Sequence, residues 1–148
     1  NRAMEQILGE EVTPIVNADL QRVPLLIYVP GMDGGINHTY GGQMDLLPTV
    51  LHLLGVETQN NIHFGTDLLS EDHSQVVPFR NGNFVSPAIY SLDGKYYDRQ
   101  TGLLLDPSQN EQAEKLSAMV EEKLNYSDKV VNGDLLRFYS KDGKVIEE

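Results

Sequence analysis

The sequence Val-Pro-Leu-Leu-Ile-Tyr-Val at residues 23–29 sets the strongest requirement on the fold of this chain. It is apolar throughout rather than alternating, which is typical of a β-strand that is covered on both faces in a parallel or mixed sheet. Pro30 and Gly31 end the run, and a glycine-rich loop leads to a helix predicted over residues 45–54. A strand followed by a buried helix is the repeating unit of a layered α/β domain. One such unit lacks strand neighbours, so we expect it to belong to a larger sheet.

Two helices are predicted around this strand. Residues 1–11 read as the end of a helix that stops at Gly9, and the helix over residues 45–54 has Gly55 as its C-terminal cap. Asp45 favours the positive N-terminal end of the second helix. The aliphatic side chains of this helix cover most of its circumference, so we expect the helix to be buried. These side chains are Leu46, Leu47, Val50, Leu51, Leu53 and Leu54.

The pattern changes near residue 76, where short apolar runs alternate with turn signals. Asp93-Gly94 lies between two aromatic runs and predicts a β-hairpin in an antiparallel meander, because both turn positions need positive φ. A long amphipathic helix is predicted over residues 109–131, with Ser108 and Glu111 as a capping box and Gly133 as its end. A last strand is predicted over residues 135–139. The apolar stripe of the long helix consists of Ala113, Leu116, Val120, Leu124 and Ser127.

The fold class that follows is α/β in two parts. Residues 1–72 are predicted to form a portion of a layered α/β domain. Residues 73–148 are predicted to form a small α+β subdomain, in which one long helix covers an antiparallel sheet. The polar stretch at residues 71–75 is the natural seam between the two parts.

Composition excludes several classes of function. With a net charge of -11 and an isoelectric point of about 4.6, the chain repels phosphate backbones, so we expect no nucleic-acid partner. It has no cysteine, which excludes disulfides, Cys-ligated zinc and thiol catalysis. The longest apolar run is far too short to span a bilayer. Because the sequence opens with Asn1 rather than methionine, we expect a larger parent protein that carries any targeting segment.

A set of imidazole and carboxylate side chains has the chemistry of zinc or manganese ligands. The set consists of His38, Asp45, His52, His63, Asp67, Asp72 and His73. Their spacing does not favour a compact site, because Asp45 and His52 lie about two helical turns apart. We therefore interpret His52 as a buried or rim histidine bound to backbone and Asp45 as a helix-end charge. We assign no metal ligand to this chain.

The other candidates also have structural interpretations. Arg80 could clamp an anion, but a salt bridge within an acid-rich chain is the simpler interpretation. The pairs Gly34-Gly35 and Gly41-Gly42 could cradle a phosphate, but without a Walker lysine they are interpreted as a structural loop. No nucleophile elbow surrounds a serine or threonine, so no catalytic residue is assigned. Three tyrosines could line a sugar surface, although alternating aromatic residues in a strand usually pack. They are Tyr90, Tyr96 and Tyr97.

Three stretches resemble the sulfatase-like family of the alkaline phosphatase superfamily. They are VPLLIYVPG at residues 23–31, GGINHTYGGQMDLLPTVLHLLGV at residues 34–56 and FGTDLLS at residues 64–70. The stretches VVPFRNGNF at residues 76–84 and SDKVVNGDLLRFY at residues 127–139 narrow the resemblance to the lipoteichoic acid synthases of Gram-positive bacteria. The fold that this resemblance implies is the C-terminal portion of an alkaline-phosphatase-like α/β domain, followed by the small subdomain.

The resemblance implies a metal-dependent enzyme that transfers glycerol phosphate from phosphatidylglycerol onto a polyglycerolphosphate chain carried by a glycolipid. It also implies a threonine nucleophile and a manganese ion held by acidic residues and a histidine, all expected upstream of this chain. The parent would act outside the cell, anchored by upstream transmembrane helices. This chain would be a structural part whose partner is the upstream half of the catalytic domain. His38 and Arg80 are kept as candidates for contact with the substrate.

Two alternatives stay open at this point. The chain could belong to another sulfatase-like hydrolase or phosphotransferase, which would differ in its upstream nucleophile. It could also be a free-standing module that binds cell-wall glycans on its tyrosines. A self-sufficient module should not expose a strand with two apolar faces, because such an edge invites aggregation. For the same reason we expect the isolated chain to oligomerise.

Overall fold

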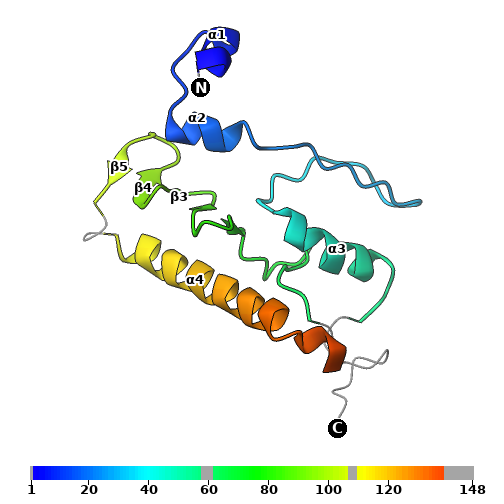
Figure 1. The fold of residues 1–148 in the computed structure, drawn as a ribbon. Coiled ribbons are helices and arrows are strands. Elements are labelled where there is room, and N and C mark those ends of the chain that lie inside the picture. Colours follow the sequence, from blue (N-terminus) through cyan, green and yellow to red (C-terminus); the bar gives the residue numbers. More distant parts are fainter. Residues whose placement is uncertain (1, 58–61, 107–109, 139–148) are drawn as a thin grey trace.

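The computed structural model describes residues 2–57, 62–106 and 110–138 (Figure 1). Short helices occupy the first part of the chain, strands the middle, and a long helix the last part. The helical elements are α1 (Arg2–Leu8), α2 (Pro14–Asp19), the 3-10 helix η1 (Gln43–Asp45), α3 (Leu46–Leu53), α4 (Glu111–Asn132) and the 3-10 helix η3 (Leu135–Phe138). The strands are β1 (Val77–Pro78), β2 (Phe84–Val85), β3 (Ile89–Leu92), β4 (Lys95–Asp98) and β5 (Leu104–Leu105).

The strands form one antiparallel sheet, in which each strand pairs with its neighbour in sequence, in the order β1-β2-β3-β4-β5. Tyr90 of β3 is paired with Tyr97 of β4. Asp93 and Gly94 join these two strands with φ angles of 52° and 73°. The predicted hairpin turn and the predicted antiparallel meander are therefore confirmed.

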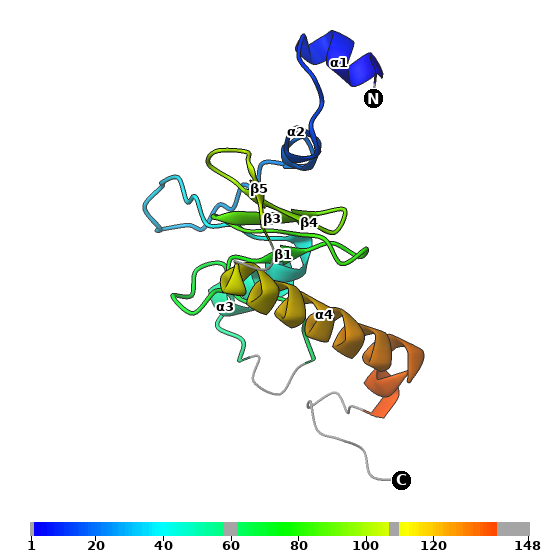
Figure 2. The ribbon, with the colours of Figure 1, turned by 90° about the vertical axis from the view of Figure 1, so that its left-hand side faces the viewer.

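Successive side chains of each strand point to opposite faces of the sheet, so both faces carry apolar side chains. A helix covers each face. Figure 2 shows α4 on one face and α2 on the other. On the α4 face, Phe84 of β2 is completely buried together with Ala113 and Val120 of α4. On the opposite face, Tyr90 of β3 packs with Ala18 of α2. The sheet is thus the centre of the described structure, with a core on each side.

The helix on the second face, α2, was not predicted from the sequence. It begins after Thr13, whose Oγ1 accepts the N–H of Val16 at 3.2 Å, and Pro14 occupies the first turn. A threonine cap followed by proline is a helix-start signal. The helix has only 6 residues, which is too short for an apolar period to show. Its importance lies in Ile15 and Ala18, which pack against the sheet.

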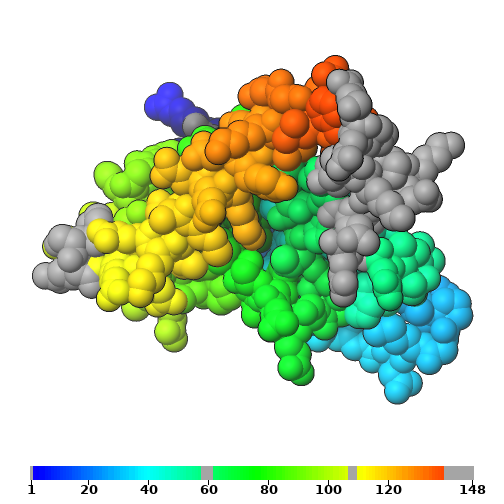
Figure 3. Space-filling model, turned by 90° about the horizontal axis from the view of Figure 1, so that it is seen from below, coloured from blue at the N-terminus to red at the C-terminus, as the bar shows by residue number. Residues whose placement is uncertain are grey.

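The long helix is confirmed, with a start that differs from the prediction. α4 begins at Glu111, and Asn110 caps it by accepting the N–H of Ala113 at 2.9 Å. The predicted cap, Ser108, lies outside the described residues. Gly133 ends the helix as predicted. Figure 3 shows α4 lying across the molecule when it is seen from below. The predicted apolar stripe contacts the core through Ala113, Leu116, Val120 and Leu124.

The strand predicted over residues 23–29 is not formed in this chain. The segment runs away from α2 as an open stretch and then turns back toward α3 (Figure 1). Leu26 is 90% exposed and Tyr28 is 86% exposed. The prediction is wrong for this chain because a strand requires hydrogen-bonded neighbours, and the described residues place none beside it.

The helix predicted over residues 45–54 is present as η1 and α3, but the burial expected for it is wrong. Leu47, Val50 and Leu54 are exposed, whereas Thr49 is completely buried. The N–H of Leu68 donates to Thr49 Oγ1 at 2.9 Å. The covered face of α3 therefore carries Pro48 and Thr49, and Thr49 is hydrogen-bonded to the following loop.

The predicted helix ends at Gly9 and Gly55 are confirmed, whereas the predicted last strand is wrong. Gly9 and Gly55 have φ angles of 73° and 70°, so both glycine stops are confirmed. The last strand, predicted over residues 135–139, is wrong because residues 135–138 form η3. The chain turns at Asp134, with φ of 49°, and the N–H of Arg137 donates to Asp134 O at 3.3 Å. Tyr139 lies outside the described residues.

Candidate functional site

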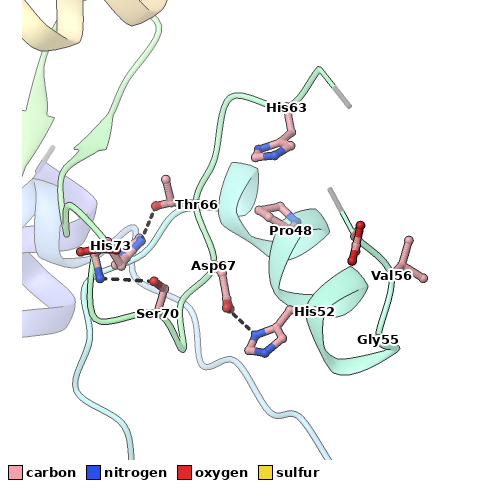
Figure 4. A pocket seen from close by; sticks show the side chains of 11 residues that line it. Pro48, His52, Gly55, Val56, His63, Thr66, Asp67, Ser70 and His73 are labelled. Carbon is pink, nitrogen blue, oxygen red and sulfur yellow. Dashed lines mark hydrogen bonds and ion pairs between the residues drawn. The ribbon is translucent and has the colours of Figure 1, made fainter. Parts of the chain in front are cut away.

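A hollow of about 560 Å³ lies between α3 and the loop that follows residue 62 (Figure 4). It brings together most of the side chains that the sequence suggested as metal ligands. Asp45 is buried at the start of α3 and does not line the hollow, and His38 is exposed on the loop before η1. The titratable side chains that line the hollow are His52, Glu57, His63, Asp67, Asp72 and His73.

Asp45 links the start of α3 to the loop. It is only 4% exposed, and its carboxylate accepts the N–H of Gly42 and the N–H of Thr66, each at 2.8 Å. A buried carboxylate is tolerated only when its oxygens are hydrogen-bonded. The helix-end role predicted for Asp45 is confirmed, and the structure adds the bond to Thr66, which lies 21 residues further along the chain.

Gly65 allows the same loop to approach η1 closely. A Cβ atom at this position would lie 2.1 Å from the carbonyl oxygen of Met44 and 2.7 Å from the backbone nitrogen of Asp45. Backbone atoms cannot move aside as a flexible side chain does. The path of the loop over η1 therefore requires glycine at residue 65.

His73 holds two segments together through both of its ring nitrogens. Its Nε2 lies 2.6 Å from the carbonyl oxygen of Tyr40, which can only accept, so Nε2 carries the proton. Nδ1 then accepts a hydrogen bond from the Thr66 hydroxyl at 2.5 Å. Thr66, His73 and a carbonyl have the order of a nucleophile, a base and an orienting group. However, the N–H groups of Thr66 and Leu68 donate to Asp45 and Thr49, so neither is free to bind an oxyanion. We interpret the arrangement as a structural link.

His52 and His63 have partners of their own. Nδ1 of His52 lies 2.5 Å from the carboxylate of Asp67, and the His52 side chain is 61% exposed. Of the two positions predicted for His52, the rim of the hollow is confirmed and the buried one is wrong. The predicted backbone partner is also wrong, because the partner is the carboxylate of Asp67. His63 instead pairs with backbone, through Nδ1 and the carbonyl oxygen of Gly65 at 2.8 Å.

The donor side chains around the hollow differ from those needed for the manganese ion that the resemblance implies. In the described residues, no three His, Asp or Glu side chains gather in a way that could hold a metal ion. His52 and His73 are turned to different partners, Asp67 and Thr66. These side chains do not fit a manganese site, and we derive no chemical step through one.

The two candidates for substrate contact occupy different surroundings. Nη2 of Arg80 lies 2.6 Å from Asp128 of α4, with the Arg80 side chain 72% exposed. The salt-bridge interpretation of Arg80 is thereby confirmed. His38 lies on the exposed loop between residue 30 and η1, where the Oδ1 of Asn37 accepts the N–H of Thr39 at 2.8 Å. The structure does not bring Arg80 and His38 to the hollow.

A polar cluster that the sequence did not reveal joins α2 to the sheet. The Tyr90 hydroxyl donates to Asp19 at 2.8 Å and accepts from Nε of Arg99 at 3.3 Å. The Tyr40 hydroxyl lies 3.5 Å away. Burial raises the pKa of Tyr90, and the hydrogen bonds with Tyr40 and Asp19 act in the same direction. Tyr90 therefore stays neutral and keeps its hydrogen for Asp19.

Two charged residues beside this cluster have shifted pKa values. The hydrogen bond to Tyr90 raises the pKa of Arg99. The side-chain hydrogen bond from Thr101 lowers the pKa of Asp98, and the N–H of Thr101 adds to the effect. Both bonds from Thr101 measure 2.7 Å. Both shifts favour the charged forms at neutral pH.

The three tyrosines considered as a sugar-binding surface do not form one. Tyr90 is 1% exposed. Tyr96 packs on Phe84 in the core between the sheet and α4, with ring centroids 6.5 Å apart. Tyr97, its neighbour in β4, packs against the core on the opposite face. The interpretation that these tyrosines pack is therefore confirmed, because successive side chains of a strand point to opposite faces and each face carries a core.

The described residues thus define a mixed α/β protein, with an antiparallel sheet between two helices and a hydrogen-bonded helix-and-loop unit beside it. None of its described helices combines the length and apolar character needed to cross a membrane. No family model matches the sequence. Known proteins of one kind, however, are similar over almost the whole chain, and three of them are described next.

The chain is 52% identical over 139 residues to lipoteichoic acid synthase 1 of Bacillus subtilis (strain 168), which is 94% of this chain and 21% of that synthase. It is 49% identical over 144 residues to lipoteichoic acid synthase 2 of the same strain, 97% of this chain and 22% of that protein. It is 48% identical over 139 residues to lipoteichoic acid synthase of Staphylococcus aureus (strain USA300), 94% of this chain and 21% of that protein.

These similarities confirm the resemblance found in the sequence. The chain is homologous to a region of the lipoteichoic acid synthases, and it spans about one fifth of the length of the relatives that it matches.

Proposed function

We propose that this chain is the C-terminal portion of a lipoteichoic acid synthase. The parent would be a glycerophosphotransferase that moves glycerol phosphate from phosphatidylglycerol onto a growing polyglycerolphosphate chain. The observation that carries this proposal is the 52% identity to lipoteichoic acid synthase 1 over 94% of the chain. In the parent, the first part of the chain would complete an alkaline-phosphatase-like layered α/β domain.

Within that parent, the chain would have a structural role. The threonine nucleophile and the manganese ion would belong to the upstream half of the catalytic domain, which would be the partner of this chain. Support comes from the partners of the titratable side chains, which belong to the chain itself. Asp45 caps a helix, His73 links two segments, and Arg80 pairs with α4. Each is engaged by the protein itself rather than turned toward a ligand.

The proposed location is the outer face of the membrane of a Gram-positive bacterium, with upstream transmembrane helices as the anchor. Support comes from the organisms of the relatives, Bacillus subtilis and Staphylococcus aureus. The relatives named above are lipoteichoic acid synthases, which favours a synthase over another sulfatase-like hydrolase or phosphotransferase. The alternative of a glycan-binding module loses the tyrosine surface on which it depended.

The structural role predicts that Arg80→Ala and His38→Ala in the full synthase leave turnover of phosphatidylglycerol within about tenfold of the parent, because the proposal places the reacting groups in the upstream half. Release of diacylglycerol from vesicles gives kcat and KM. Lys115→Ala is a matched control, because Lys115 is 73% exposed and pairs with Glu111 at 2.6 Å, much as Arg80 pairs with Asp128.

A residue that stabilises developing charge costs about a hundredfold or more in kcat when it is removed. Such a loss for Arg80→Ala or His38→Ala, with the fold intact by circular dichroism and Lys115→Ala unaffected, would contradict the structural role. A parent synthase that releases no diacylglycerol from phosphatidylglycerol would contradict the proposed activity itself.

A further inference from the structure

The hydroxyl of Tyr90 in β3 meets both ends of one long segment. Residues 20–39 leave the end of α2, run out as an open stretch and return toward η1 (Figure 1). At the first end, the Tyr90 hydroxyl donates to Asp19 at 2.8 Å, and at the second end the Tyr40 hydroxyl lies 3.5 Å from it. These two contacts bridge 71 and 50 residues of sequence. One buried hydroxyl therefore closes the base of the segment.

The second end of the segment is also held through the backbone of Tyr40. Its carbonyl oxygen accepts the Nε2 hydrogen of His73 at 2.6 Å, and its N–H donates to Oε1 of Gln75 at 3.3 Å. Gln75 has a φ angle of 51°, which a residue other than glycine keeps only where its surroundings hold it. Both partners come from the polar stretch that the sequence marks as the seam. Tyr40 therefore joins the segment to the seam as well as to the sheet.

Arg99 completes the contacts at the base. Its Nε donates to the Tyr90 hydroxyl at 3.3 Å, and its guanidinium lies over the ring of Tyr40, 5.7 Å from the centroid. A cation over a tyrosine ring is attracted by the negative face of the ring. Arg99 follows β4, so it ties both tyrosines to the same hairpin. Three side chains thus surround the hydroxyl of Tyr90.

We infer that Tyr90 is a joint that couples the two ends of residues 20–39, so that both ends open together rather than independently. The segment between them contributes little of its own, since Leu26 is 90% exposed and Tyr28 is 86% exposed. Once such a closure is lost, an open segment gains conformational freedom at both ends. In the proposed synthase, the joint would hold the small subdomain in one position against the α/β part. That consequence rests on the proposed function.

Hydrogen exchange of the 148-residue chain with Tyr90→Phe tests the joint, because this change keeps the buried ring and removes only the hydroxyl. The amides of residues 20–22 donate to the last turn of α2, and the amide of Tyr40 donates to Gln75. All of these are expected to exchange at least about tenfold faster, because Asp19 and Arg99 lose their shared partner. Amides of the hairpin between β3 and β4 should change by less than about twofold.

Tyr97→Phe is the matched control for Tyr90→Phe. Tyr97 is paired with Tyr90 across the hairpin and packs against the same core, but its hydroxyl has no hydrogen-bond partner among the described residues. It should leave exchange at both ends unchanged. Equal acceleration by the two variants, or none by Tyr90→Phe, overturns the joint.

A pair of variants at Asp19 tests the coupling from one end to the other. Asp19→Ala removes the acceptor of the Tyr90 hydroxyl, whereas Asp19→Asn keeps an oxygen that can accept it. Asp19→Ala should accelerate exchange at Tyr40 by at least about fivefold, and Asp19→Asn should largely restore the slow exchange. Acceleration that stays at residues 20–22 overturns the joint, because the two ends would then open independently. This pair also decides the matter should Tyr90→Phe fail to fold.

The exchange of Tyr90→Phe in the full synthase separates this inference from the proposed function, because exchange requires no turnover. Faster exchange at both ends in a synthase that does not turn over phosphatidylglycerol would leave the joint standing and remove the proposed activity. A synthase that turns over phosphatidylglycerol but shows no acceleration at either end would keep the activity and overturn the joint.

Discussion

Replacing Phe84 by alanine is expected to lower the free energy of unfolding of the 148-residue chain by about 3–5 kcal/mol, the usual cost of removing a buried phenylalanine. Phe84 is completely buried, between the sheet and α4. Its ring contacts Tyr96 and the core that includes Val120. Because small domains are stable by only about 5–15 kcal/mol, this change removes much of the stability of the sheet and α4.

Urea denaturation followed by circular dichroism measures this effect. Leu103→Ala is the matched control, since Leu103 lies in the same sheet region but is 67% exposed, and it should cost less than about 1 kcal/mol. An equal, small loss for both variants would mean that the core between the sheet and α4 does not stabilise the chain.

Replacing Gly65 by alanine is expected to cost about 3 kcal/mol, at the upper end of the usual cost of overpacking. The new methyl group would lie 2.1 Å from Met44 O and 2.4 Å from Met44 C, both of which are backbone atoms. To relieve this overlap the loop must move away from η1. That movement would break the 2.8 Å bond between the N–H of Thr66 and Asp45.

Gly34→Ala provides the comparison for Gly65→Ala, because a Cβ at residue 34 has nothing within 4 Å and the backbone there does not need positive φ. Gly34→Ala should leave the unfolding midpoint unchanged or raise it slightly. The measurement is the urea midpoint of each variant at one protein concentration. Similar midpoints for the two variants would show that the loop does not pack on η1 as described.

The sheet and the long helix were predictable because their determinants are local. The turn at Asp93-Gly94 depends on two residues that adopt positive φ easily. The stripe that includes Ala113 and Val120 depends only on the helical period. Neighbours in sequence become neighbours in the sheet, so each strand finds its partner nearby.

The first part of the chain was predicted less well because its contacts are distant in sequence. Residues 23–29 have the composition of a covered strand, but composition does not say where the covering chain comes from. The leucines of α3 suggested burial, yet Leu47 and Leu54 are exposed, and Thr49 is buried through a hydrogen bond to Leu68, 19 residues away.

The site shows the same division between local and distant determinants. Asp45 was interpreted correctly as a helix-end charge, because a cap is a local feature. The link from His73 to Tyr40 spans 33 residues, and the bond from Tyr90 to Asp19 spans 71. Neither pair stands at a spacing that helices or hairpins impose. His52 pairs with Asp67 rather than with a backbone group, and this pair likewise has no spacing that predicts it from the sequence.

In the proposed synthase, the catalytic residues lie in the upstream half, and this chain supports their structure. The most direct measurement compares the two proteins with phosphatidylglycerol vesicles and manganese, after the mass of the 148-residue chain has been verified. We predict that the full synthase releases diacylglycerol and that the chain alone releases none above a protein-free blank. Manganese-dependent release by the chain alone would contradict the account.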